Sequence, residues 1–202
     1  MFNLTPVIKN LLLTNVVVFS LAILFRLFNI ELFQYFALFD PKSQYFQYWQ
    51  FITHQFLHSG PLHLLFNMLA LASLGPFVET YFGGKKFLTF YLVSGVIAAL
   101  LYILTSNINS TNVDIPMVGA SGALFGVLAF FAIIHPNEKL YLFLIPIGIK
   151  AKWAIGVLIA IELGLSLHSD PNDHVAHMAH IGGALSGLLF YLPIIYKKIY
   201  NK

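Results

Sequence analysis

Two residues have the chemistry of a nucleophile and its base, and each lies near the start of an apolar segment. Ser121 belongs to the Gly-Ala-Ser-Gly segment that begins at Gly119, where small neighbours leave the hydroxyl uncovered. A position near a helix N-terminus supplies free backbone N–H groups and a positive dipole end, which suit an oxyanion. From this motif alone, Ser121 is equally interpretable as a small packing residue in a glycine-rich helix contact.

His180 is the candidate proton acceptor, because imidazole titrates near neutrality and can take a serine's proton. His180, Gly183 and Gly187 share one helical face. Counted from Met117 and from His174, with which the two helices are expected to open, Ser121 lies about 6 Å deep and His180 about 9 Å deep, at 1.5 Å per residue. We expect the face of His180 to pack on the glycines of the serine helix, which are Gly119, Gly122 and Gly126.

Two further polar residues are candidates for stabilising a negatively charged oxygen. His63 and Asn67 are four residues apart and so lie on the same helical face. Their N–H groups suit an oxyanion hole, and the alternative for each is a hydrogen bond between helices.

His54 and His58 are predicted to structure the loop before this helix. Because neither Glu79 nor Glu162 is predicted to lie at the depth of the serine, we expect a Ser–His dyad without a carboxylate.

The composition predicts a membrane protein. Of 202 residues, 58% are hydrophobic and 9% are charged, against about 25% charged in an ordinary soluble domain. The absence of cysteine excludes disulfides and thiol chemistry. A net charge of +3, dispersed along the chain, does not indicate a nucleic-acid partner. The length allows one domain, residues 1–202.

Six segments are long and apolar enough to cross a bilayer as helices of about 20 residues. They are residues 10–29, 61–81, 86–106, 117–134, 152–168 and 175–196. The aromatic stretch 31–57 is predicted to be an interfacial loop, since aromatic rings favour the headgroup level. Residues 140–149, with Pro146 and Gly148, are predicted to be an interfacial connection. The fold class is therefore an all-α bundle of six transmembrane helices, and no small-residue cleavage site follows the first segment.

The distribution of basic residues predicts the orientation. With the N-terminus in the cytoplasm and six alternating spans, nine of the 11 basic residues fall inside, and Arg26 and Lys42 do not. Cytoplasmic loops are enriched in lysine and arginine, so the sequence predicts an N-in and C-in topology. The nine are Lys9, Lys85, Lys86, Lys139, Lys150, Lys152, Lys197, Lys198 and Lys202. The outer loops carry Asp40, Asp114, Asp170 and Asp173.

In this order and on these helices, the motifs resemble those of the rhomboid intramembrane serine proteases in their minimal six-helix bacterial form. The resemblance covers nearly the whole chain. It rests on His63-x-x-x-Asn67, Gly119-Ala120-Ser121-Gly122 and Ala179-His180-x-Gly182-Gly183, with the Trp49–His58 segment, Gly75-x-x-x-Glu79-x-x-x-Gly83 and Ile145-Pro146. One departure is Gln50, which stands where the family often has arginine after tryptophan, so the resemblance supplies no anchoring role for that position.

The resemblance implies a Ser121–His180 dyad within the membrane that opens to its outer face. The N-in topology and the lack of a transit peptide favour a prokaryotic plasma membrane over an organelle. His63, Asn67 and the backbone N–H of Ser121 would form the oxyanion hole. The implied reaction is cleavage of a peptide bond in or near a transmembrane segment of another membrane protein, without metal or cofactor. The implied partners are transmembrane protein substrates and the lipid bilayer, and the oligomeric state stays undetermined.

Two alternatives belong to other functional classes. One is a rhomboid-fold protein that binds membrane clients without cleaving them, against which the intact Ser121 and His180 speak. The other is a metal-binding membrane protein, prompted by eight histidines. The sequence lacks H-E-x-x-H and a carboxylate cluster, which hydrolytic zinc sites usually have. The histidines at helical spacings are His54, His58, His174, His177 and His180.

Overall fold

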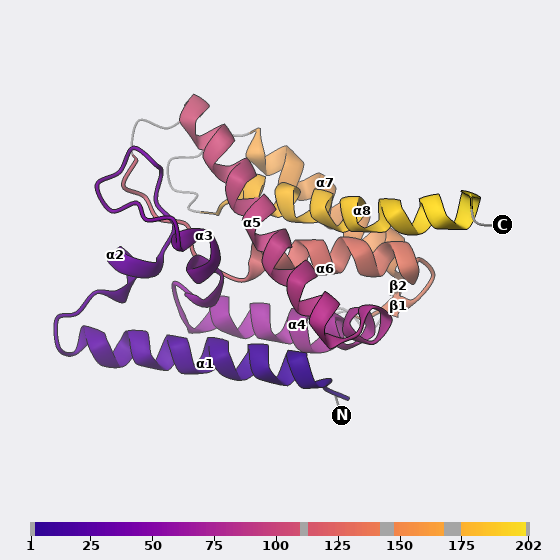
Figure 1. The fold of residues 1–202 in the computed structure, drawn as a ribbon, viewed down its shortest axis with the longest axis horizontal. Helices are drawn as coiled ribbons and strands as arrows, with labels where there is room; N and C mark the ends of the chain where they lie inside the picture. The colour runs from indigo at the N-terminus through magenta and orange to yellow at the C-terminus, as the bar shows by residue number, and fades with distance from the viewer. Residues whose placement is uncertain (1–2, 110–112, 142–147, 168–174, 201–202) are drawn as a thin grey trace.

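The computed structural model describes residues 3–109, 113–141, 148–167 and 175–200, most of them helical (Figure 1). Ile145, Pro146, Asp170, Asp173, His174 and Lys202 lie outside the described residues. The long helices are α1 (Pro6–Arg26), α4 (Pro61–Phe82), α5 (Gly84–Asn109), α6 (Ser121–Ile134), α7 (Ala151–Ser166) and α8 (His177–Tyr200). The short elements are α2 (Leu32–Phe36), α3 (Gln50–Thr53), the 3-10 helix η1 (His54–Phe56) and the antiparallel strands β1 (Lys139–Leu140) and β2 (Ile149–Lys150).

Each of the six apolar segments overlaps a long helix over most of its length, but two helices begin later than predicted. The fourth begins at Ser121, because Met117 pairs with Leu38 in an antiparallel bridge and Gly119 has a φ of 120°. Ser121 is therefore the first residue of α6, and its predicted depth of about 6 Å below the helix start is wrong. The described part of α8 begins at His177, which places His180 about one turn inside the helix.

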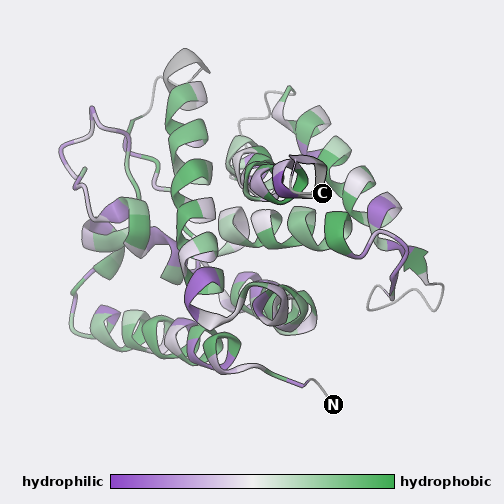
Figure 2. Ribbon diagram, turned by 45° about the vertical axis from the view of Figure 1, so that its right-hand side comes forward, coloured by the Kyte–Doolittle hydropathy of each residue, from purple (hydrophilic) through white to green (hydrophobic). Residues whose placement is uncertain are grey.

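Four helices are long and apolar enough to cross a membrane, namely α1, α4, α5 and α8. With 14 residues, α6 is about 21 Å long, less than the roughly 30 Å of a hydrocarbon core. It packs against α4, α5, α7 and α8, which surround it in Figure 1. Figure 2 shows that the helices of the bundle consist mostly of hydrophobic residues. This short central helix is therefore held by protein contacts, with little surface left for lipid.

A buried carboxylate holds the start of α1 against α4. The two oxygens of Glu79 accept hydrogen bonds from the backbone N–H groups of Val7 (3.1 Å) and Ile8 (2.9 Å). The hydroxyl of Thr5 donates to the same carboxylate. Because the first N–H groups of a helix have no partner within it, Glu79 satisfies them from a neighbouring helix.

The loop between α1 and α4 is organised around the buried amide of Gln50. Its Oε1 accepts from the backbone N–H groups of Phe39 (3.3 Å) and Gln47 (3.1 Å). Its Nε2 donates to the carbonyl oxygens of Tyr45 (2.8 Å) and Tyr35 (3.4 Å). Gln50 therefore anchors the loop in this protein, although the family resemblance supplied no such role for it.

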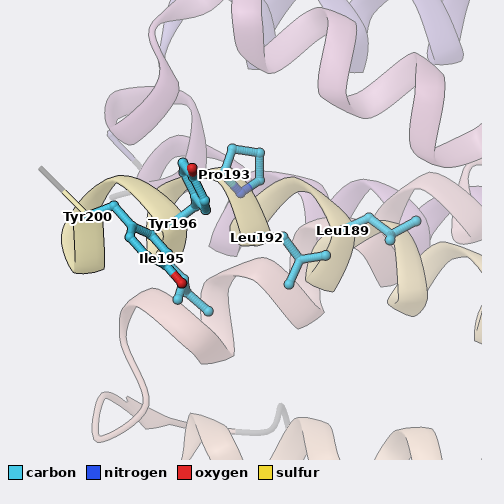
Figure 3. A pocket seen from close by; sticks show the side chains of 6 residues that line it. All are labelled: Leu189, Leu192, Pro193, Ile195, Tyr196 and Tyr200. Atoms are coloured by element: carbon cyan, nitrogen blue, oxygen red, sulfur yellow. The ribbon is translucent and has the colours of Figure 1, made fainter.

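An open apolar groove runs along the C-terminal half of α8 (Figure 3). Its lining residues are Leu189, Leu192, Pro193, Ile195, Tyr196 and Tyr200. His180 lies at the other end of the same helix, more than two turns from the first of these residues. The groove is therefore separate from the polar site described next.

Candidate active site

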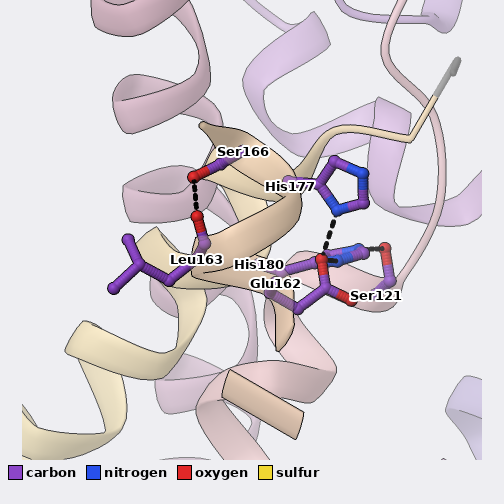
Figure 4. A network of polar contacts seen from close by, with 6 residues as sticks. All are labelled: Ser121, Glu162, Leu163, Ser166, His177 and His180. Carbon is purple, nitrogen blue, oxygen red and sulfur yellow. Dashed lines mark hydrogen bonds and ion pairs between the residues drawn. The ribbon is translucent and has the colours of Figure 1, made fainter. Parts of the chain in front are cut away.

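The structure brings the predicted serine and histidine together. The Oγ of Ser121 lies 2.8 Å from the Nε2 of His180, within hydrogen-bond distance. Ser121 is partly exposed, whereas His180 is buried, with 8% of its surface accessible. Figure 4 shows the ring of His180 facing the serine hydroxyl. The hydroxyl can thus reach an incoming group while its partner is shielded.

An aromatic ring from α6 fixes the plane of the imidazole. The ring of Phe125 stacks on that of His180 with centroids 4.4 Å apart and planes at 10°. Phe125 follows Ser121 by four residues, which places both on the same face of α6. The sequence interpretation missed this contact, although that spacing marks Phe125 as a neighbour of whatever Ser121 touches.

Glycines allow the close approach of α6 and α8 that the Ser121–His180 contact requires. A Cβ on Gly183 would collide with the carbonyl group of Gly122, and one on Gly187 would lie 2.7 Å from the carbonyl oxygen of Gly126. Real Cβ atoms are not found at such distances, so the two backbones touch only because these positions carry no side chain. The predicted packing role of Gly122, Gly183 and Gly187 matches these contacts.

Gly119 has a different position from the one predicted for it. It precedes α6, and its φ of 120° disfavours residues with a side chain. A Cβ there would lie 2.7 Å from Cε1 of His63, so Gly119 faces α4 and not α8. Its N–H donates to the carbonyl oxygen of His54 (2.9 Å). The assignment of Gly119 to the α6–α8 contact is therefore wrong, because the chain is not yet helical at this residue.

His54 connects the loop before α4 to the segment before Ser121, because its carbonyl oxygen accepts from the N–H of Gly119. Burial lowers the pKa of its imidazole to about 4, so the ring is neutral at pH 7. Its Nδ1 lies 2.7 Å from the carbonyl oxygen of Gln50, to which a neutral ring can donate its proton. His58 is also buried, and its ring packs edge-on against that of His63 with centroids 5.1 Å apart. Both histidines are structural parts of this region, in keeping with the sequence prediction.

His63 is oriented so that its Nε2 lies beside Gly119, in the segment that precedes α6. Its Nδ1 accepts from the N–H of Ser59 (3.4 Å) and lies 3.0 Å from the hydroxyl of Ser59. An Nδ1 that accepts leaves the ring proton on Nε2, which is the nitrogen beside Gly119. Asn67 is buried, and its Nδ2 donates to the carbonyl oxygen of His63 (2.8 Å). Its second amide N–H remains available for another acceptor.

A carboxylate also reaches the site, contrary to the expectation that none would. Glu162 of α7 lies with Oε2 2.8 Å from Nδ1 of His180 and 2.6 Å from Nδ1 of His177 (Figure 4). The prediction that Glu162 does not lie at the depth of the serine is therefore wrong. Glu162 and His177 are 15 residues apart and belong to different helices, so helical spacing within one segment gave no sign of the contact.

The described elements are those of an integral membrane protein with a serine and a histidine in contact at the end of its central helix. A family model for the rhomboid domain matches residues 45–197, more than half of the chain. The chain therefore belongs to the rhomboid family, and the resemblance seen in its motifs is confirmed.

Named relatives agree with this assignment. The chain is 34% identical to the mitochondrial Rhomboid protein 1 of Saccharomyces cerevisiae, over 69% of this chain and 40% of that protein. It is 34% identical to rhomboid protease GluP of Bacillus subtilis, over 70% of this chain and 25% of GluP. It is 32% identical to the putative rhomboid protease YdcA of Bacillus subtilis, over 75% of this chain and 70% of YdcA. The chain thus matches less than half of the first two relatives' length.

Proposed function

We propose that this protein is an intramembrane serine endopeptidase in which Ser121 is the nucleophile and His180 the general base. The observation that carries the proposal is the 2.8 Å contact between the Oγ of Ser121 and the Nε2 of His180. In the reaction, Nε2 takes the hydroxyl proton while Oγ attacks the carbonyl carbon of a peptide bond. The same proton then passes from His180 to the leaving amine. In the second half of the reaction, His180 takes a proton from the water that attacks the acyl-enzyme and returns it to the oxygen of Ser121.

The negative oxygen of the tetrahedral intermediate needs donors, and three groups are proposed for it. The backbone N–H of Ser121 is at the first turn of α6, where N–H groups have no helical acceptor. The Nε2–H of His63 and the second amide N–H of Asn67 complete the set. The position of His63 beside Gly119 supports this role. Donors placed before the reaction stabilise charge as it develops, without reorganising.

The substrates are proposed to be transmembrane segments of other proteins. Rhomboid membership and the apolar helices support a reaction within the bilayer. A substrate helix must unwind locally first, because helical hydrogen bonds occupy the carbonyl that Ser121 attacks. The site uses side chains and backbone donors of the chain itself, so the proposed reaction requires no metal or cofactor. We further propose six spans with both termini in the cytoplasm of a prokaryotic plasma membrane, and a site open to the outer face.

Covalent labelling tests the proposal. Purified protein is treated with a fluorescent fluorophosphonate, which reacts with activated serines, and a model transmembrane substrate is assayed in parallel. The wild type is expected to be labelled and to cleave, whereas Ser121→Ala and His180→Ala are expected to do neither. Ser166→Ala is the matched control, since this hydroxyl bonds only the carbonyl of Leu163 in its own helix among the contacts described (2.7 Å).

Full labelling of the Ser121→Ala variant would remove Ser121 from the mechanism. If the wild type is neither labelled nor active but retains a bound transmembrane protein, the client-binding function is the correct one.

A further inference from the structure

A single carboxylate oxygen bridges two histidines of α8 beside the candidate nucleophile. Oε2 of Glu162 lies 2.6 Å from Nδ1 of His177 and 2.8 Å from Nδ1 of His180. The three side chains are 10–12% exposed, so water screens their interaction little. They come from two helices, and Figure 4 shows them converging at the end of α6 where Ser121 lies.

The two contacts of Glu162 differ in geometry. The contact with His177 is a hydrogen bond, in which the ring N–H donates to the carboxylate. The contact with His180 is as close as an ion pair, but Nδ1 of His180 has no well-directed hydrogen bond among the described residues. The oxygen therefore approaches Nδ1 away from the in-line direction. Attraction between charges does not need that alignment, so the carboxylate still acts on the ring.

The imidazole of His180 thus lies between a hydroxyl and a carboxylate, with Nε2 bonded to the first and Nδ1 close to the second. A neutral imidazole carries one proton, and a neighbouring anion favours the tautomer with that proton on Nδ1. Nε2 then keeps its lone pair for the proton of Ser121. When that proton is transferred, the same anion stabilises the positive ring.

We propose that Glu162 is a positioning residue for His180, itself held in place by His177. It sets the tautomer of the base and stabilises the imidazolium, which extends the proposed dyad by a third member. The inference rests on the proposed function, because the role of Glu162 is defined by what His180 does for Ser121. Glu162 does not touch the substrate and is not a catalytic residue in that sense.

A metal site is the competing interpretation of these three residues, since their ligand atoms lie within 4.8 Å of one another. Zinc ligands at 2.0–2.1 Å in a tetrahedral site are separated from each other by roughly 3.4 Å. The oxygen of Glu162 and Nδ1 of His177 are only 2.6 Å apart, a distance typical of a charge-assisted hydrogen bond. The spacing therefore favours a proton over a metal ion between them.

The test compares two glutamate-to-glutamine substitutions that make the same chemical change in different places. Fluorophosphonate labelling rates are measured from pH 5 to 9. Glu162→Gln is expected to reduce the rate at pH 7 by about 10–100-fold, and to move the midpoint of the acidic limb to lower pH, because no anion stabilises the charged ring. Glu162→Asp keeps the charge and is expected to restore that midpoint toward the wild-type value.

Glu79→Gln is the matched control, because Glu79 is buried and bonded but holds the start of α1. This variant is expected to lower the melting temperature and leave the pH profile of labelling unchanged. If Glu162→Gln lowers only the melting temperature, Glu162 is a structural residue and the inference is wrong. Zinc binding to the wild type at micromolar concentration, lost in His177→Ala, would also overturn it.

A readout independent of activity separates this inference from the proposed function. In protein labelled with ¹⁵N-histidine, the ring signals of His180 report its tautomer and are assigned by the His180→Gln variant. We expect the Nδ1–H tautomer in the wild type and a mixture in Glu162→Gln. Identical spectra would refute the role of Glu162, whereas a wild type that shows the expected tautomer but is not labelled would refute the protease function alone.

Discussion

At the residue scale, a line of contacts crosses three helices and gives each group a distinct chemical task. Ser121 of α6 contacts His180 of α8, which contacts Glu162 of α7. Phe125 stacks on the ring and restricts its rotation. The partners of His180 therefore include a hydrogen bond at Nε2, a nearby carboxylate beside Nδ1 and a ring on one face, which leaves the base few alternative positions.

The first residue-scale prediction concerns one donor of the proposed oxyanion hole. Asn67→Ala is expected to reduce kcat by no more than about 10²–10³-fold, because removing a single donor leaves the nucleophile, the base and the other donors in place. Cleavage of a model transmembrane substrate measures the effect. Asn67→Asp is the control, since it keeps the size of the side chain but replaces the donor with acceptors. A variant Asn67→Ala as inactive as Ser121→Ala would contradict a supporting role for this amide.

At the element scale, the position of the site depends on how closely α6 and α8 approach. Gly122 and Gly183 touch through their backbones, and Gly126 and Gly187 do the same one turn further along both helices. In a membrane, helices associate through such close packing, since lipid is as apolar as the side chains. The hydroxyl and the imidazole meet as a consequence of this contact.

The element-scale prediction adds one methyl group to this contact. Gly183→Ala forces α6 and α8 apart and is expected to destabilise the protein by about 1–3 kcal/mol, the usual cost of overpacking. Thermal unfolding in detergent measures the stability, and the labelling rate of Ser121 is expected to fall with it.

Gly156→Ala on α7 is the matched control, because nothing lies within 4 Å of a Cβ at this position. It is expected to be neutral or slightly stabilising, since alanine favours a helix more than glycine does. Equal melting temperatures for the two variants would contradict the close contact at Gly183.

At the scale of the whole molecule, the distribution of charge predicts how the protein lies in a membrane. Lysines gather around β1 and β2, where Lys139 pairs in register with Lys150. Arg26, one of the two exceptions to the predicted distribution, forms an exposed ion pair with Glu31 at 3.6 Å. The charge of Arg26 is therefore partly balanced where it lies.

The whole-molecule prediction is the orientation, and the absence of cysteine makes it directly testable. Lys42→Cys and Lys139→Cys each introduce one thiol at an exposed position. A membrane-impermeant maleimide is expected to label the first in intact cells and the second only after permeabilisation, because lysine-rich segments stay in the cytoplasm. The reverse pattern would contradict the N-in, C-in topology.

Much of the chemistry and the helical organisation followed from the sequence. The serine, the histidine and the glycines near them were identified by residue type and spacing, and long apolar segments predicted the positions of the helices. These signals are local, since hydropathy and helical periodicity are read within one segment. The six-span count stays a prediction, because α6 and α7 are shorter than an ordinary span.

Other features arise from contacts between distant parts of the chain, and the tertiary structure alone decided them. The start of α6 depends on the pairing of Met117 with Leu38. Gln50 anchors a loop through carbonyl and N–H groups of non-helical backbone. Glu162 reaches His180 because α7 and α8 pack side by side at one depth. Such depths depend on where loops end and how helices pack, and neither is encoded in the spacing of residues within a single helix.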